Sequence, residues 1–139
     1  MSKKVKTLLI LLILFFGGRK SYCQDYTTEK QKILNVVINS VQFDSIYFSK
    51  RVYIQTNELL SIKSGFDLKR EEYKVRFVNR VGAGLVKQYI VLGDFTMARE
   101  NPQAVRVQIE VMPQNILLNM RLTKNDSEWK IANHLIMYD

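Results

Sequence analysis

Two residues of this 139-residue chain stand out as candidates for acid–base catalysis. His134 is the only histidine, and Asp94 interrupts an apolar run beside Gly93. A carboxylate and an imidazole within hydrogen-bond reach of one substrate could transfer protons at a carbonyl group, with Tyr53 or Tyr89 as hydrogen-bond donor. A surface histidine and a bulge-associated aspartate are the simpler interpretation, and we favour it. Tyrosine also suits half-buried strands without any catalytic role.

A second group of candidates lies on alternating positions of two apolar segments. Arg106, Gln108 and Glu110 alternate with apolar residues, and Asn119 and Arg121 do so further on. Such a polar face is usually only solvated, but it could be the floor of a pocket or a docking surface, where Arg and Tyr anchors are favoured. The candidate binding residues are Arg106, Gln108, Arg121 and Tyr138.

Several other kinds of chemistry are poorly supported by the sequence. One histidine and one cysteine, Cys23, make a zinc site improbable, because zinc sites gather several His or Cys ligands. The sequence has no G-x-S-x-G, no phosphate-cradling Gly-rich loop and no H-E-x-x-H motif. We therefore predict neither a cofactor nor a metal.

The N-terminal segment has the pattern of a secretory signal peptide. Three lysines precede nine consecutive apolar residues, 8–16, which are too few for the roughly 20 helical residues that cross a bilayer. Gly17 and Gly18 follow, and the small residues Ser21 and Cys23 suit cleavage before Gln24. The sequence therefore predicts a signal peptide at residues 1–23, a single domain at 24–139 and an exported protein, periplasmic or secreted. An uncleaved anchor and a lipoprotein at Cys23 are the alternatives, and no stable membrane insertion is expected after cleavage.

Removal of this segment changes the charge of the chain. The whole chain has 21 basic and 13 acidic residues, a net charge of +8, and five of the basic residues but none of the acidic ones precede Gln24. The mature chain would keep 16 basic and 13 acidic residues, a net charge of +3. Its basic residues are scattered rather than clustered, so we do not expect a nucleic-acid partner.

The mature segment begins with a helical pattern and continues with strands. Thr28 and Gln31 match a capping box at a helix start, and an apolar stripe follows at helical spacing: Leu34, Val37, Ile38 and Val41. Short strands are predicted in 51–55 and 58–62. The segment 71–81 fits a strand or a helix, and the strand is favoured.

The second half predicts four strands in succession. Residues 86–97 form a strand with a bulge near Gly93, and residues 104–112 alternate cleanly between apolar and polar side chains. A third strand is predicted at 115–123 and, after a turn at 124–127, a last one at 128–138. Simple alternation along this last strand would place His134 on the face opposite Trp129. Consecutive antiparallel pairing is the economical topology, so the expected fold is α+β, an N-terminal helix packed on a curved antiparallel sheet.

The helix, the strands and the closing segment LTKNDSEWKIANHLIMYD together resemble the nuclear transport factor 2-like superfamily, also described as cystatin-like. Many small exported bacterial members end in an apolar strand, a polar turn and Trp-Lys-Ile; here these are Leu122, residues 124–127 and residues 129–131. The resemblance implies a cone-like fold whose sheet wraps a pocket. The family has two or three helices before the meander, whereas this sequence predicts one. Its members include isomerases, dehydratases and non-catalytic binding domains, so the fold alone assigns no function.

Three functional hypotheses follow from these observations. The first is a small exported binding or accessory domain of the bacterial cell envelope, whose partner is an envelope protein or a small-molecule ligand. The second is a pocket enzyme of the isomerase or hydratase type that uses Asp94, His134 and a tyrosine. The third is a structural domain that self-associates as a homodimer.

Overall fold

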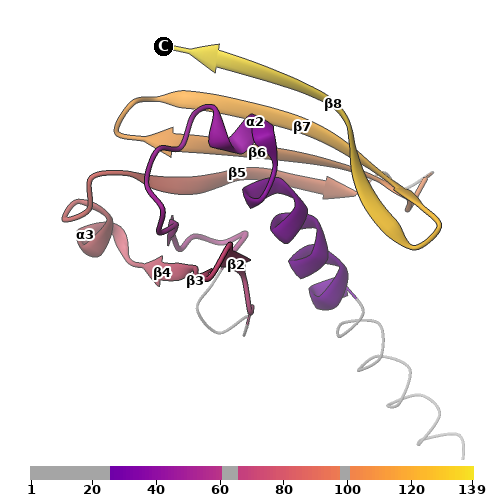
Figure 1. The fold of residues 1–139 in the computed structure, drawn as a ribbon, viewed down its shortest axis with the longest axis horizontal. Coiled ribbons are helices and arrows are strands. Elements are labelled where there is room, and N and C mark those ends of the chain that lie inside the picture. The colour runs from indigo at the N-terminus through magenta and orange to yellow at the C-terminus, as the bar shows by residue number, and fades with distance from the viewer. Residues whose placement is uncertain (1–25, 61–65, 98–100) are drawn as a thin grey trace, which may run out of the picture. The chain divides into compact units, whose positions relative to one another are not determined.

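The computed structural model describes residues 26–60, 66–97 and 101–139 (Figure 1). The chain divides into two units, Met1–Lys30 and Gln31–Asp139, and the strands named below belong to the second. The predicted signal peptide and its cleavage site lie outside the described residues, as does part of the strand predicted at 58–62. Within the described ranges, no helix is both long and apolar enough to span a membrane.

The predicted α+β class is confirmed by a curved six-stranded sheet combined with a few helices. Four long strands form most of this sheet: β5 (Tyr89–Met97), β6 (Ala104–Met112), β7 (Ile116–Asn125) and β8 (Glu128–Tyr138). They pair consecutively and antiparallel, and they lie side by side in Figure 1. The predicted meander is therefore confirmed.

The alternation predicted for the central strands is also confirmed. In β6 and β7 alternate apolar residues, from Val105 to Val111 and from Ile116 to Leu122, are at most 6% exposed, whereas the residues between them are partly or fully exposed. Asp126 and Ser127 form the predicted turn before β8 with φ values of 49° and 69°. Positive φ at both central residues of a hairpin turn matches the twist of the strands that it joins.

The other side of the sheet departs from the purely antiparallel prediction. β1 (Tyr53–Gln55) lies between β4 (Arg76–Val78) and β5, and it runs parallel to both. Parallel neighbours need long connections to return the chain in the same direction. The alternation of residues within a strand does not indicate how the chain returns, so it could not predict this parallel pairing.

The segment 71–81, which fitted either a strand or a helix, contains both. It contains β3 (Tyr73–Lys74) and β4, and a turn of helix, α3 (Arg80–Ala83), follows. Asn79 separates strand from helix, because its side-chain oxygen accepts a hydrogen bond from the Gly82 N–H at 2.7 Å. This is the usual role of an N-cap residue.

The N-terminal helix begins earlier than its sequence pattern indicated. Residues 26–38 are helical, so the prediction of a helix start at Thr28 is wrong. Gln31, the other residue of the supposed capping box, accepts a hydrogen bond from the Asp67 N–H at 3.1 Å. Val41 leaves the predicted stripe and is 75% exposed, because the chain turns at Ser40 and starts a new helix, α2 (Val41–Asp44).

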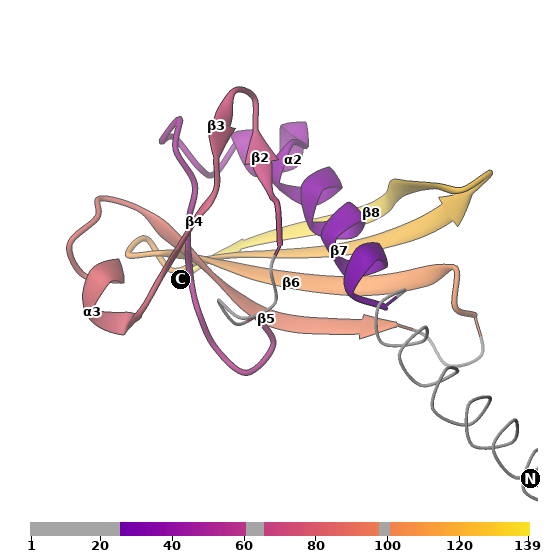
Figure 2. The ribbon, with the colours of Figure 1, turned by 90° about the horizontal axis from the view of Figure 1, so that it is seen from below.

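Amide side chains on the helix hold a short hairpin made of β2 (Lys69–Arg70) and β3. Asn35 accepts a hydrogen bond from the Lys69 N–H at 3.2 Å. Asn39, one helical turn further on, donates to the Lys69 carbonyl at 2.8 Å and accepts from the Glu71 N–H at 3.4 Å. Figure 2 shows the hairpin beside α2. Asn39 directly follows the last helical residue, so the spacing of four residues places both amides on one side of the helix, where they satisfy backbone groups of Lys69 and Glu71.

One hydrophobic core cluster gathers residues from the helix, α2, the loops and the sheet. Its fully buried members include Phe43 and Tyr47, whose rings stack with centroids 5.0 Å apart. The members of this cluster from the N-terminal helix are Ile33, Leu34, Val37 and Ile38. The face of the β5–β8 meander that turns away from this cluster is called the outer face below.

Candidate functional site

The outer face carries polar side chains from neighbouring strands in matched positions. Arg106 of β6 lies directly opposite Arg121 of β7, and Gln108 lies opposite Asn119. These positions are exposed or partly exposed, whereas their neighbours along each strand are buried. Residues directly opposite in an antiparallel pair share a face, so the register sets the two arginines side by side.

A β-bulge in β5 brings Asp94 to this face. The pairing shifts between Leu92 and Asp94, which leaves Gly93 unpaired and Asp94 opposite Gln108. A Cβ atom at Gly93 would lie 2.9 Å from Gln108 Nε2, so the glycine gives the glutamine side chain its space. The Asp94 carboxylate accepts a hydrogen bond from Thr96 Oγ1 at 2.6 Å. The bulge predicted near Gly93 is confirmed.

A second bulge changes the orientation of residues in β8. Leu122 pairs with Ile131 but Arg121 pairs with Asn133, so Ala132 is an extra residue. The prediction that simple alternation places His134 opposite Trp129 is therefore wrong. His134 pairs with the buried Met120, on the core side of the strand, although it remains exposed. Beyond the bulge Ile136 packs against the core, whereas Leu135 and Met137 are exposed.

An open groove of about 360 Å³ collects most of the predicted site residues. It crosses β5, β6, β7 and β8 and is called the outer groove below. Its lining residues are Asp94, Arg106, Gln108, Asn119, Met120, Arg121, Asn133, His134 and Leu135. The structure thus brings Asp94 and three of the four predicted binding residues together on the outer face. His134 borders the same groove from β8, where its pairing with Met120 assigns it to the core side of the strand.

The three predicted tyrosines do not line this groove. Tyr53 belongs to β1, Tyr89 is the first residue of β5 opposite Met112, and Tyr138 is the last residue of β8. Within the part of the chain that the structure describes, no tyrosine lines the groove beside Asp94. Tyr138 is 69% exposed at the end of the sheet.

The arginines of the outer groove lack the counter-charges that surface arginines usually attract. Among the ion pairs and hydrogen bonds within the described residues, none engages the side chain of Arg106 or Arg121. The only carboxylate lining the groove, Asp94, lies opposite Gln108 rather than opposite an arginine. The two positive charges thus share one open surface.

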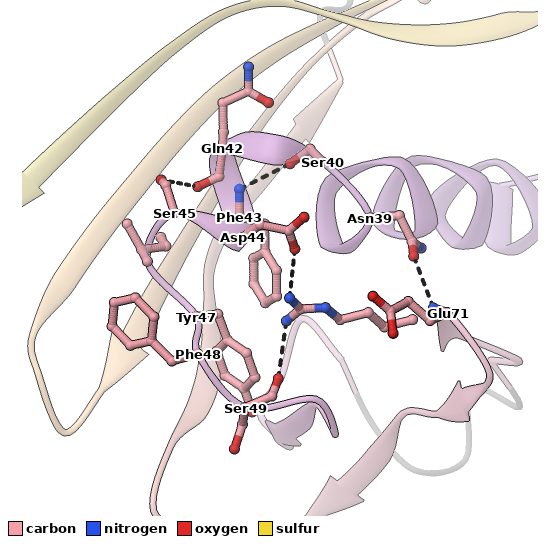
Figure 3. A network of polar contacts seen from close by, with 12 residues as sticks. Asn39, Ser40, Gln42, Phe43, Asp44, Ser45, Tyr47, Phe48, Ser49 and Glu71 are labelled. Carbon is pink, nitrogen blue, oxygen red and sulfur yellow. Dashed lines mark hydrogen bonds and ion pairs between the residues drawn. The ribbon is translucent and has the colours of Figure 1, made fainter.

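A partly exposed polar network, which no sequence pattern indicated, lies at another place in the fold (Figure 3). Arg70 forms an ion pair with Asp44 at 2.6 Å and donates to the Ser49 carbonyl at 3.3 Å. Its guanidinium carbon lies 5.2 Å from the Phe43 ring centroid and 5.5 Å from that of Tyr47. These contacts anchor β2 to α2 and to the loop that follows, and no motif in the sequence marked them.

Tyr47 and Gln88 complete this internal framework. The Tyr47 hydroxyl lies 3.1 Å from the carbonyl oxygens of both Arg51 and Gln88, and it accepts a hydrogen bond from the Tyr53 N–H at 3.2 Å. Burial raises the pKa of Tyr47 above its ordinary value. The Gln88 side chain accepts from the Phe48 N–H at 2.9 Å and donates to a backbone carbonyl of the same loop. Complete satisfaction of these groups indicates a structural role.

Neither a metal centre nor a known relative assigns an activity to these residues. Within the described ranges, no group of three or more His, Cys, Asp or Glu side chains could hold a metal ion. Comparison with protein-family models, with curated proteins and with solved structures finds no match.

Proposed function

We propose that the mature chain is an exported binding domain of the bacterial cell envelope and that the outer groove is its binding surface. The observation that carries this proposal is the convergence of Arg106, Gln108, Arg121 and Asp94 from three strands on one open groove. Arginines and amides at an open surface can hydrogen-bond a partner without any chemical step. The partner is an envelope protein or a small-molecule ligand.

A pocket enzyme is the second candidate, because Asp94 and His134 line the same groove. Three observations make it the weaker one. The Asp94 carboxylate is engaged by Thr96 at 2.6 Å, and the groove is open to solvent. Proton transfer to carbon is favoured where a site excludes water around its base, and among the described residues no tyrosine lines the groove.

The finer features of the fold are part of the same proposal. We propose that the helix packs on the inner face of the sheet, in the cone-like arrangement that the nuclear transport factor 2-like resemblance implies. The complete burial of Val37 in one cluster with strand residues supports this packing. Val37→Asp should then prevent folding, whereas Val41→Asp, at a 75% exposed position, should leave the circular dichroism spectrum unchanged. A folded Val37→Asp variant would argue against the packing.

Photo-crosslinking in the native host tests the binding surface. A photoreactive amino acid would replace Gln108 in the outer groove or, as the control, Lys74, an exposed residue of β3. The proposal expects adducts, detected by intact mass and by gel shift, from position 108 only. Equal adducts from both positions, or none from position 108, would show that the groove is not the binding surface.

Export is tested separately by recovering the protein from the envelope fraction and sequencing its N-terminus. Cleavage at the predicted place leaves Gln24 as the first residue. A protein retained in the cytoplasm with residues 1–23 attached would overturn the proposed location, whatever the groove binds.

A further inference from the structure

The register of the central strands creates an electrostatic conflict on the outer face. Arg106 and Arg121 are direct cross-strand partners, and the Cβ atoms of such partners lie about 4.5–5.5 Å apart. Like charges placed directly opposite each other destabilise a sheet. No ion pair or hydrogen bond between described residues relieves these two guanidinium groups.

The surroundings of the pair leave room for a ligand that would relieve the conflict. Both arginines line the outer groove, and both also line a second hollow of about 410 Å³ together with Thr96, Ala104 and Val105. The two arginines therefore border both hollows. Neutral amides, among them Gln108 and Asn133, add further hydrogen-bond donors along the groove.

We propose that Arg106 and Arg121 together form a binding site for an oxyanion, a carboxylate or phosphate group. This inference rests on the proposed function, because it names the chemistry of the ligand that the outer groove takes. A guanidinium group presents a planar fork of donors that matches the two oxygens of a carboxylate or phosphate. An anion bound between the two guanidinium groups would offset the repulsion between their charges and accept charge-assisted hydrogen bonds from both.

The oxyanion could be a free inorganic ion or the acid group of a larger apolar molecule. The second source has support on β8, where Leu135, two residues from the Asn133 that pairs with Arg121, is 56% exposed. The apolar part of an organic acid could lie on this side chain while its acid group meets the arginines. Inorganic phosphate and octanoate are therefore the two probes that separate these sources.

The test is calorimetric titration of the purified protein with each probe in low-salt buffer. Arg106→Gln and Arg121→Gln are each expected to weaken binding at least about tenfold, since each removes charge-assisted hydrogen bonds. Arg80→Gln is the matched control: it removes the same charge from an exposed position on α3, and binding should stay within about twofold of the wild type, as expected for a screened distant charge. Arg121→Lys keeps the charge but not the fork and should bind with intermediate affinity.

The outcomes separate this inference from the proposed function. Binding of phosphate and octanoate with similar affinity indicates a site for free inorganic anions, whereas tighter octanoate binding that Leu135→Ser weakens indicates an organic acid. The oxyanion site is overturned if neither probe binds. It is also overturned if Arg80→Gln weakens binding as much as Arg106→Gln and Arg121→Gln do. Crosslinks from position 108 would still support the groove as a binding surface in that case, through its neutral groups.

Discussion

Arg121 provides a prediction at the residue scale that needs no ligand. Because its charge lies directly opposite that of Arg106, Arg121→Gln should raise the free energy of unfolding in low salt by up to about 1 kcal/mol. The gain should shrink as salt screens the exposed charges. Urea denaturation at low and high salt measures both effects. A destabilised Arg121→Gln variant would mean that the arginine has a favourable partner within the protein.

Tyr47 provides a second residue-scale prediction, on the stability of the core. Its hydroxyl satisfies the Tyr53 N–H and lies beside two backbone carbonyl groups in a side chain that is 1% exposed. Tyr47→Phe keeps the ring but leaves these groups unpaired, which should cost about 1–3 kcal/mol of unfolding free energy. Tyr89→Phe, at a partly exposed position, is the control and should cost much less. Equal losses from the two variants would contradict the structural role of the Tyr47 hydroxyl.

The same tyrosine predicts how stability depends on alkaline pH. Burial raises the pKa of Tyr47 in the folded state, so the unfolded state loses this proton first. The stabilisation is present below the unfolded-state pKa of about 10 and is lost as pH rises through the higher folded-state pKa. The difference in unfolding free energy between wild type and Tyr47→Phe should therefore shrink as pH rises above about 10. A pH-independent difference would show that burial does not shift this pKa.

At the scale of elements, the amides of the N-terminal helix should determine how firmly the β2–β3 hairpin is held. Asn39 exchanges two hydrogen bonds with the hairpin backbone, whereas Asn35 accepts one from Lys69. Asn39→Ala should therefore lower the unfolding free energy by about 1–2 kcal/mol and Asn35→Ala by about half as much. Faster hydrogen exchange of the Glu71 amide in Asn39→Ala alone would confirm the pairing. Unchanged exchange would contradict it.

Among these elements, some could be predicted from the sequence and others could not. Strict alternation predicted β6 and β7, because each has one buried and one open face. Gly93 marked the first bulge, since a glycine permits the close approach of the Gln108 side chain. Alanine at position 132 does not indicate a bulge, so neither the second bulge nor the face on which His134 lies was predicted. β1 was recognised as β-rich, but its parallel neighbours depend on distant returns of the chain.

The candidate site was predictable as separate residues but not as a pair. The alternation identified Arg106 and Arg121 as polar positions on strands. Their opposition depends on the length of the turn between β6 and β7, and one residue more or less would have changed the register. A charge conflict of this kind is therefore a property of the paired strands, and it becomes visible only once the register is known.

At the scale of the whole molecule, the sheet ends at a long strand that needs protection from other chains. Among the described strands, β8 pairs only with β7, and it exposes Leu135, Met137 and Tyr138. An exposed apolar edge strand is a template for self-association. Three features work against that here: the charge of Lys130, the bulge at Ala132, and the Asn133 side chain, which accepts a hydrogen bond from the His134 N–H at 2.8 Å. We infer that the bulge limits pairing between copies.

Deletion of Ala132 tests this inference because it removes only the extra residue. Leu122 would still meet Ile131 and Arg121 would still meet Asn133, so the fold should persist while the edge becomes regular. Light scattering after size exclusion should then show a monomeric wild type and a deletion variant that associates as concentration rises. Leu135→Lys in the deletion background should reverse the association, because a charge on an edge strand opposes pairing. A wild type that is already dimeric, with a mass unchanged by the deletion, would favour the self-associating structural domain and place its contact away from the edge of β8.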